Sequence, residues 1–214
     1  MSTSVYVRTK EYRPSNYYRI VQYTPYLKST KLHSLLPSSL YKAGIRYRET
    51  PLIKIFVRII IYIWIAGSLT FYLVKDNLKV PSSIIVQKEL MPIYMPLYIS
   101  FLLRRLARKS QLIWDFDDNI FEQRQASRKE LNILIKYSKF IITTNDYLKS
   151  KIDKKYQYKV ILMPTTDKDM LVPNLSKQNN KRLITYKNGI HLIWIGTSFN
   201  LHNLISVISY LDKA

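Results

Sequence analysis

Short apolar runs alternate along the chain with longer segments of helical periodicity. Each short run places mainly branched or aromatic side chains at consecutive positions, which is typical of a strand buried on both faces of a parallel sheet. The expected strands are Val5–Val7, Leu32–Leu36, Ile84–Val86, Leu112–Trp114, Phe140–Thr144 and Val160–Met163. The expected helices between them are Asn16–Ser29, Pro51–Val74, Met95–Lys109, Lys129–Tyr137 and Asp146–Lys154. The sequence therefore predicts an α/β fold with a doubly wound, mostly parallel, Rossmann-like sheet.

A polar stretch at residues 166–189 separates this α/β region from the end of the chain. Because Asp, Asn, Lys, Ser and Gln dominate there, residues 1–165 are expected to form the first domain and residues 166–189 a linker. Residues 190–214 hold one more apolar run, His191–Ile195, and one more helical segment, Phe199–Asp212. One strand and one helix cannot close a core, so we expect an incomplete second Rossmann-like domain and a truncated chain.

The most apolar part of the chain is the segment Leu52–Val74. Its last 16 residues, Ile59–Val74, carry no charge and would form about 24 Å of helix, less than the roughly 30 Å of a bilayer core. Three interpretations stay open: a helix packed on the sheet or on a partner, an interfacial helix at a membrane, and a transmembrane span. Cations at its start would attract anionic headgroups; they are Lys42, Arg46, Arg48, Lys54 and Arg58. We expect a soluble fold that visits the membrane surface.

The amino-acid composition indicates a folded protein and an anionic partner. The 214 residues are 47% hydrophobic, which is enough for a folded core and excludes a disordered chain. With 34 basic and 14 acidic side chains the net charge is +20, so an anionic partner is expected: nucleic acid, a phosphorylated substrate or a lipid surface. The chain has no cysteine and only 4 glycines. This excludes disulfides, thiolate metal sites and glycine-rich phosphate loops, and it fits a reducing cytoplasm.

Three acidic residues, Asp115, Asp117 and Asp118, follow the fourth expected strand. Open α/β sheets bind ligands in the crevice at this end of their strands. Three roles stay open for the carboxylates. They could hold a divalent cation as an Asp-x-Asp pair, orient an acceptor hydroxyl in the cleft, or serve the structure by capping the next segment or pairing with Arg124 and Arg128.

Several segments, taken in order, resemble the GT-B type glycosyltransferases, specifically the group 1 or family 4-like sugar transferases of bacterial surface-polysaccharide clusters. The matching segments are Asn16–Arg19, Val86–Leu90, Trp114–Phe121, Phe140–Asn145, Val160–Thr165 and His191–Ser198. The most specific is Trp114–Phe121, which is similar to the family's Asp-Phe-Asp-Asp signature. Two features depart from the family: no glycine-rich turn follows the first strand, and the chain has no Glu-x7-Glu motif on the donor side.

The resemblance implies a transferase that moves a sugar from a nucleotide-diphosphate donor to a carbohydrate or lipid-linked acceptor in surface polysaccharide biosynthesis. Residues 1–165 would hold the acceptor, and residues 190–214 would begin the donor-binding domain. The nucleotide sugar is a substrate, so neither a further cofactor nor a metal is expected. The protein would be cytoplasmic, with peripheral attachment at the inner membrane face. Without most of the donor-binding domain, this chain would have little or no activity alone.

The matched positions also supply candidate site residues. The expected catalytic residues are Asp117 and Asp118, the expected acceptor-binding residues are Arg19, Lys88, Glu89 and Asp115, and the expected donor-binding residues are Gly196 and Thr197. Each group has a plainer alternative. Arg19 could be a solvated cation, Lys88 and Glu89 could pair with one another at little gain, and Gly196 could belong to an ordinary tight turn.

Two rival functions come from the charge and the apolar segment. A net charge of +20 would suit a basic nucleic-acid-binding protein, but the cations are spread over every segment and form no recognised binding module, so no nucleic acid is expected as a partner. The other rival is a non-catalytic scaffold at a membrane surface. Duplex DNA binding with a steep salt dependence would favour the first rival, and vesicle binding without recognition of a sugar nucleotide would favour the second.

Overall fold

A computed structural model describes residues 2–10, 14–27, 29–121, 126–166 and 205–208. The chain divides into two compact units, residues 1–168 and residues 169–214. In the second unit, the described residues 205–208 form one helical turn with exposed side chains. The expected strand His191–Ile195 lies outside the described residues. The first unit holds the sheet and all the side chains considered below.

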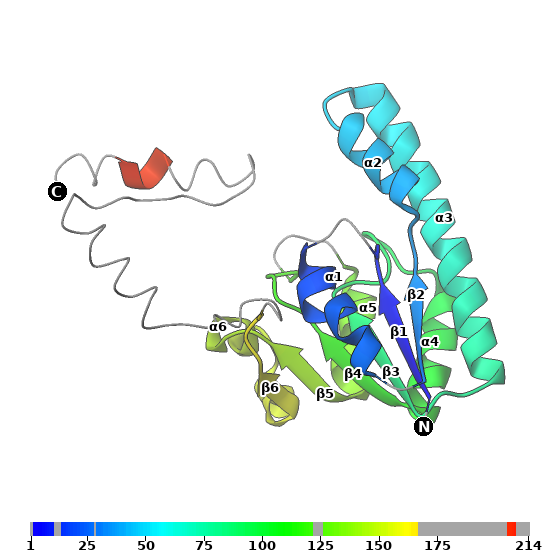
Figure 1. The fold of residues 1–214 in the computed structure, drawn as a ribbon, viewed down its shortest axis with the longest axis vertical. Coiled ribbons are helices and arrows are strands. Elements are labelled where there is room, and N and C mark those ends of the chain that lie inside the picture. The colour runs from blue at the N-terminus through cyan, green and yellow to red at the C-terminus, as the bar shows by residue number, and fades with distance from the viewer. Residues whose placement is uncertain (1, 11–13, 28, 122–125, 167–204, 209–214) are drawn as a thin grey trace. The chain divides into compact units, whose positions relative to one another are not determined.

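The first unit is built on a six-stranded sheet in which every neighbouring pair is parallel, in the order β2-β1-β3-β4-β5-β6 (Figure 1). The strands are β1 (Thr3–Val7), β2 (Thr30–Ser34), β3 (Ser83–Gln87), β4 (Gln111–Asp115), β5 (Ser138–Thr143) and β6 (Val160–Leu162). Each overlaps a strand that the apolar runs predict. The parallel, Rossmann-like α/β fold expected from the sequence is confirmed.

The connections between strands are helical. They are α1 (Pro14–Arg19) with the 3₁₀ helix η1 (Val21–Tyr26), α2 (Ser38–Arg46), α3 (Pro51–Leu78), α4 (Leu97–Lys109), α5 (Arg128–Tyr137), and α6 (Asp146–Ser150) with the 3₁₀ helix η2 (Lys154–Lys159). The helix expected over Asn16–Ser29, which Pro25 would kink or restart, is divided in the structure. The α-helix ends at Arg19, and the chain tightens into η1, which contains Pro25; proline has no N–H for helical bonding. Helix α2 had no strong apolar signal and none of its residues is buried.

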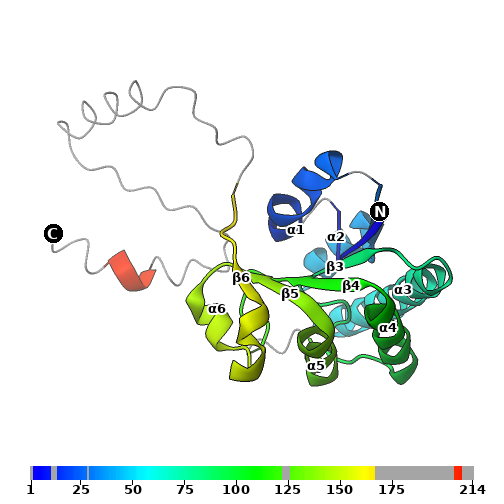
Figure 2. The ribbon, with the colours of Figure 1, turned by 90° about the horizontal axis from the view of Figure 1, so that it is seen from below.

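The two faces of the sheet are covered unequally. Helices α3, α4 and α5 lie on one face, and α1 lies on the other (Figure 2). The strand order explains this division, because the chain moves outward from β1 to β2 and then turns back past β1 to β3. With right-handed crossovers, a reversal of direction puts the connecting helices on opposite faces. The reversal creates a switch point between β1 and β3, where open α/β sheets bind ligands at the carboxyl ends of the strands.

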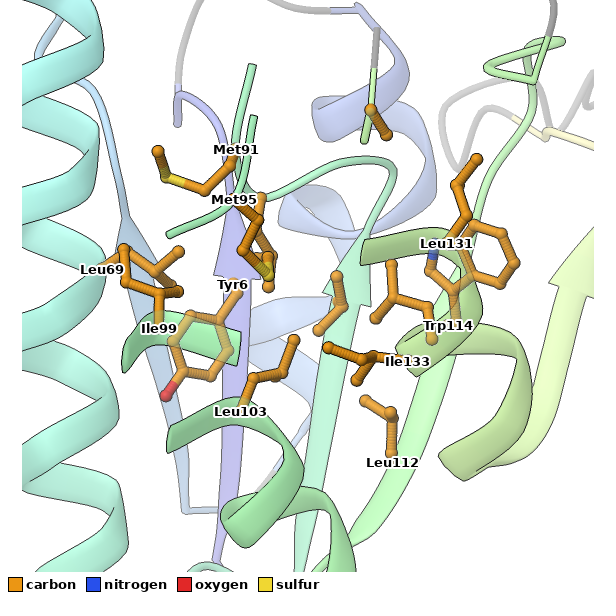
Figure 3. Packing of buried hydrophobic residues seen from close by; sticks show 14 of the residues in the cluster. Tyr6, Leu69, Met91, Met95, Ile99, Leu103, Leu112, Trp114, Leu131 and Ile133 are labelled. Atoms are coloured by element: carbon orange, nitrogen blue, oxygen red, sulfur yellow. The ribbon is translucent and has the colours of Figure 1, made fainter. Parts of the chain in front are cut away.

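The main core lies between the sheet and the layer of α3, α4 and α5. Figure 3 shows Tyr6, Leu103, Trp114 and Ile133 side by side in this layer. Trp114 and Phe116 are fully buried, and their ring centroids are 4.5 Å apart. A smaller cluster on the α1 face consists of Val5, Val7 and Ile20, with Leu32 and Ile85 packed against it. The alternation of residues along β1 therefore fills both layers.

Helix α3 is only partly a core helix. Its carboxyl-terminal half buries Ile65, Leu69 and Leu73 on the sheet, whereas its amino-terminal half extends past the sheet together with α2 (Figure 1). By length and composition α3 could cross a membrane, but a core helix of the same composition would be mostly buried. Only 17% of its most apolar 18-residue window is buried. Of the three interpretations left open by the sequence, packing on the sheet describes the carboxyl-terminal half of α3.

A polar cluster fixes the buried half of α3 to the first two strands. The Tyr6 hydroxyl donates a hydrogen bond to Asp76 at 2.7 Å, and the His33 ring nitrogen lies 3.3 Å from the same carboxylate. Burial raises the pKa of Asp76, but its hydrogen bonds from His33, Tyr6 and Ser4 outweigh this and leave the pKa below its usual value. His33 also stacks on Tyr72 of α3 with ring centroids 4.4 Å apart.

Candidate functional site

Charged side chains meet at the switch point. Arg8 follows β1 directly, and Lys88 and Glu89 follow β3. The Arg8 guanidinium donates a hydrogen bond of 2.9 Å to the Glu89 carboxylate, and both side chains are buried. Because β1 and β3 are adjacent and parallel, their carboxyl ends bring together residues that are 81 positions apart in sequence. The expected acceptor-binding residue Glu89 therefore lies buried at the switch point, paired with Arg8.

The backbone of Lys88 turns sharply as the chain leaves β3. Its φ of 58° lies in the left-handed region, which a residue with a Cβ occupies only at a cost. Two hydrogen bonds hold it there: the Lys88 N–H donates to the Asp115 carbonyl at 2.7 Å, and the Trp114 indole donates to the Lys88 carbonyl at 2.9 Å. The ends of β3 and β4 are thereby fastened together, and the Lys88 side chain is aimed across the crevice.

The ammonium group of Lys88 gathers three side chains. It lies 3.0 Å from Asp117, contacts Asp118, and donates to the Ser15 hydroxyl at 2.9 Å. The structure thus brings both expected catalytic residues onto one cation. Pairing of Lys88 with its neighbour Glu89 is wrong as an alternative, because the two side chains have different partners. The side chain of Asp118 is 53% exposed and that of Asp117 is 14% exposed, so Asp118 is the more accessible carboxylate.

Arg19 and Asp115 form a second pair at the same edge of the sheet. The Arg19 Nε donates to both carboxylate oxygens of Asp115, at 3.0 and 2.9 Å, and Nη2 donates to Oδ1 at 2.5 Å. Its Nη1 donates to the Met163 carbonyl and the Thr165 hydroxyl. Burial opposes ionisation of Arg19, but its hydrogen bonds to Asp115 raise its pKa above the usual value. Arg19 is therefore a buried, fully engaged cation, unlike the solvated helix cation of the alternative interpretation.

A largely apolar cavity of about 300 Å³ lies beside this pair. Its floor is the uncovered part of the α1 face of the sheet, formed by Ile85, Ile113 and Ile142, and Tyr18 and Tyr23 line its wall. The charged groups of Arg19 and Asp115 stand at its border. Sequence reasoning missed this cavity. The signal for it is the Ile at alternate positions of neighbouring strands, combined with the shortness of α1.

Glu130 lies beside the candidate site, although the sequence indicated only a role in capping helix α5. The Ser-x-x-Glu spacing of Ser127 and Glu130 indicates a capping box, and the Ser127 hydroxyl does accept from the Glu130 N–H at 3.1 Å. The Glu130 carboxylate, however, accepts hydrogen bonds from the N–H groups of Leu90 and Met91. It holds the loop after Glu89 in place. Complete burial raises the pKa of Glu130 to about 8.

Not every expected residue can be placed. The expected donor-binding residues Gly196 and Thr197 lie outside the described residues, as does Arg124. Within the described ranges, no group of three or more histidine or acidic side chains could hold a metal ion. The Asp-x-Asp pair of the sequence is Asp115 and Asp117, and each carboxylate has its own cationic partner: Arg19 pairs with Asp115, and Lys88 pairs with Asp117.

Comparisons with family models, with curated proteins and with solved structures gave no match. The chain is thus characterised by its architecture, a six-stranded parallel α/β domain of Rossmann-like order, and by the charged groups at its switch point.

Proposed function

We propose that this chain supplies the acceptor-binding side of a GT-B type glycosyltransferase, which moves a sugar from a nucleotide-diphosphate donor to a carbohydrate or lipid-linked acceptor. One observation carries the proposal. The segment Trp114–Phe121, which resembles the family signature, begins at the carboxyl end of β4 and directs Asp117 and Asp118 onto Lys88 of the neighbouring strand end. A signature that served only the core would not put two carboxylates at the ligand-binding edge of the sheet.

In this proposal Asp118 meets the acceptor. Its carboxylate is half exposed and can accept a hydrogen bond from a sugar hydroxyl, which orients the oxygen lone pair for attack on the donor. Asp117 lies deeper and, through Lys88, fixes the place of Asp118. Lys88 also keeps the two carboxylates from repelling each other.

The other charged residues of the candidate site hold the surrounding backbone segments in place. Arg8 and Glu89 brace the end of β1 against the end of β3, and Arg19 and Asp115 brace α1 against the end of β4. Because the side chains of both pairs are buried and bonded to one another, they set the shape of this edge of the sheet and do not contact the acceptor directly. The donor would be bound by residues that include Gly196 and Thr197, with backbone N–H groups at a strand-to-helix turn facing a phosphate; this remains a proposal from the resemblance.

Saturation-transfer NMR on the full chain tests the acceptor role. The probes are a panel of soluble oligosaccharides and of nucleotide-diphosphate sugars, compared with and without Asp118→Asn. We expect at least one oligosaccharide to bind, and Asp118→Asn to weaken it by about tenfold or more because a charged hydrogen-bond acceptor is lost. Asp153→Asn is the matched control, since Asp153 is exposed and pairs with Lys155 away from the crevice. Equal binding to Asp118→Asn, or no oligosaccharide binding together with salt-steep binding to duplex DNA, would overturn the proposal.

A further inference from the structure

The outer side of α3 carries an uninterrupted apolar stripe. Residues at helical spacing on this side are exposed, including Phe56 at 66%, Ile63 at 63% and Phe71 at 63%. The remaining exposed members are Leu52, Ile59, Val74 and Leu78. A Cβ placed on Gly67, which fills the gap between Ile63 and Phe71, would meet nothing within 4 Å. The stripe follows the whole helix, which at 28 residues is about 42 Å long.

The neighbouring helix α4 continues the surface. Helices α3 and α4 pack side by side, and Asn77 of α3 donates to the Leu102 carbonyl of α4 at 3.1 Å. The first turns of α4 expose Leu97, Tyr98 and Phe101. Exposed apolar area of this extent on two adjacent helices is rare for a monomeric soluble surface and indicates an interaction site. Together, the stripe on α3 and these three residues of α4 are called the α3–α4 face below.

Cations flank the α3–α4 face on the side of α4. At the tip of α3, Arg48, Lys54 and Arg58 line a different hollow, which they share with Tyr41 and Gly44 of α2. At the other end the last turns of α4 carry a basic group around one hollow lined also by Phe101. That group is Arg104, Arg105, Arg108 and Lys109. An apolar face bordered by this basic group fits an anionic lipid surface, since the apolar side chains enter the headgroup region while the cations of α4 meet the phosphates.

We propose that the α3–α4 face binds peripherally to the surface of an anionic phospholipid bilayer. This goes beyond the glycosyl-transfer proposal and does not depend on it. The choice of lipid over a second copy of the chain follows from charge, because two copies of a +20 chain would bring like cations together at this face. An anionic bilayer complements them.

The attachment is at the surface and does not span the bilayer. The buried half of α3 is fixed to β1 and β2 by Asp76, Tyr6 and His33, and Ile65, Leu69 and Leu73 pack into the core. A transmembrane position would pull these side chains out of the domain and would carry Asp76 into hydrocarbon. With the fold intact, only the outer side of α3 is available to lipid.

Vesicle co-sedimentation of the full chain tests the proposal. The vesicles are phosphatidylcholine alone and phosphatidylcholine with an equal amount of phosphatidylglycerol. We expect binding to the anionic vesicles that weakens with added salt. The double variant Phe56→Ser/Ile63→Ser is expected to reduce partitioning by about tenfold or more because two apolar anchors are lost. Arg105→Gln and Lys109→Gln, which change the basic group beside Phe101, should each reduce it by about fivefold.

The controls separate lipid contact from loss of fold. Tyr158→Ser removes an exposed apolar side chain from η2, on another part of the domain, and should leave binding unchanged. Trp64 of α3 is half exposed, whereas Trp114 is buried; the third tryptophan, Trp194, lies outside the described residues. In Trp194→Phe, the fluorescence of Trp64 should shift to the blue on binding anionic vesicles, and adding Trp64→Phe should abolish the shift. Circular dichroism checks that each variant is folded.

Three results would overturn the proposal. One is failure of the folded wild-type chain to bind anionic vesicles. Another is binding that Phe56→Ser/Ile63→Ser leaves intact. The last is concentration-dependent self-association, without lipid, that the same double variant abolishes, because it would assign the α3–α4 face to a second copy. Failure of oligosaccharide binding in the NMR experiment would leave the lipid result standing, so the two proposals can fail separately.

Discussion

The ammonium group of Lys88 lies 3.0 Å from the carboxylate of Asp117, joining the loops that follow two neighbouring strands. The contact is almost entirely sheltered from water, since the side chains are 7% and 14% exposed. A sheltered charge without its partner is costly, so each residue depends on the other. Asp118 shares the same ammonium from a more exposed position.

Replacing Lys88 with Met should destabilise the domain through Asp117 and Asp118. Methionine retains a Cβ, so the unusual φ of residue 88 costs the same in both proteins, and the change isolates the loss of the ammonium. We expect the free energy of unfolding to fall by about 1–3 kcal/mol at pH 7, measured by urea denaturation. Adding Asp117→Asn to Lys88→Met should restore part of the loss, because it removes one uncompensated carboxylate. A double variant no more stable than Lys88→Met would contradict this account.

Breaking the Arg19–Asp115 pair should lower the free energy of unfolding by more than Lys88→Met does. Arg19→Met leaves a buried carboxylate without its bidentate partner, and the free energy of unfolding should fall by about 3–5 kcal/mol. The matched control is Lys155→Met, which breaks an exposed pair with Asp153 and should have no measurable effect. Asp115→Asn in the Arg19→Met background should recover stability. If Arg19→Met and Lys155→Met were equally stable, the buried pair would not have the role assigned to it.

Glu130 should make stability depend on pH in the neutral range. Its pKa is raised from 4.5 to about 8 in the folded protein, so between these values the native state binds more protons than the unfolded state. The contribution of Glu130 is fully present below about pH 4.5 and is lost as the pH rises towards 8, with a slope of at most about 1.4 kcal/mol per pH unit.

The measurement for Glu130 is urea denaturation of the wild type and of Glu130→Gln at several pH values from 5 to 9. The wild type should lose stability over this range relative to Glu130→Gln, whose side chain does not titrate. Parallel pH profiles for the two proteins would show that Glu130 does not titrate there.

The two described glycines in helices should respond differently to alanine. Gly67 lies in open space within α3, so Gly67→Ala should raise the free energy of unfolding by up to about 1 kcal/mol through helix propensity alone. At Gly44 of α2, an added Cβ would lie 3.0 Å from the Ile61 side chain. Gly44→Ala should therefore gain less than Gly67→Ala, or lose stability, since Ile61 must move. Thermal melts of both variants test the order.

The strands were predictable because their apolar runs are short, branched and bounded by turn residues. Ile84–Val86, for example, falls inside β3 (Ser83–Gln87). Helix α2 had no comparable signal, because none of its residues is buried and only Leu40 and Tyr41 pack, partly buried, against the core. Pro25 indicated an interruption after α1, but its position was hidden, since the apolar spacing continues past Arg19, where the α-helix ends.

The acids of the candidate site could be placed at a strand end from the sequence, but their partners could not. The contacts of Lys88 with Asp117 and of Arg8 with Glu89 join residues far apart in the chain, and strand order and register decide them. Glu130 shows that a sequence motif can miss the main contact of a side chain. Its spacing from Ser127 fits a capping box, yet its carboxylate serves a loop about forty residues away.

The contacts of Asp76 connect α3 to the first two strands, so a force on α3 would be transmitted to these strands. The free half of α3 and helix α2 form an arm. Asp76, near the other end of α3, is bonded to Tyr6 of β1 and lies beside His33 of β2. A force applied near Pro51 acts across about 20 Å of helix, at about 1.5 Å per residue, before it reaches Ile65, where α3 begins to pack into the core. It is delivered to β1, the strand whose far end carries Arg8 into the crevice.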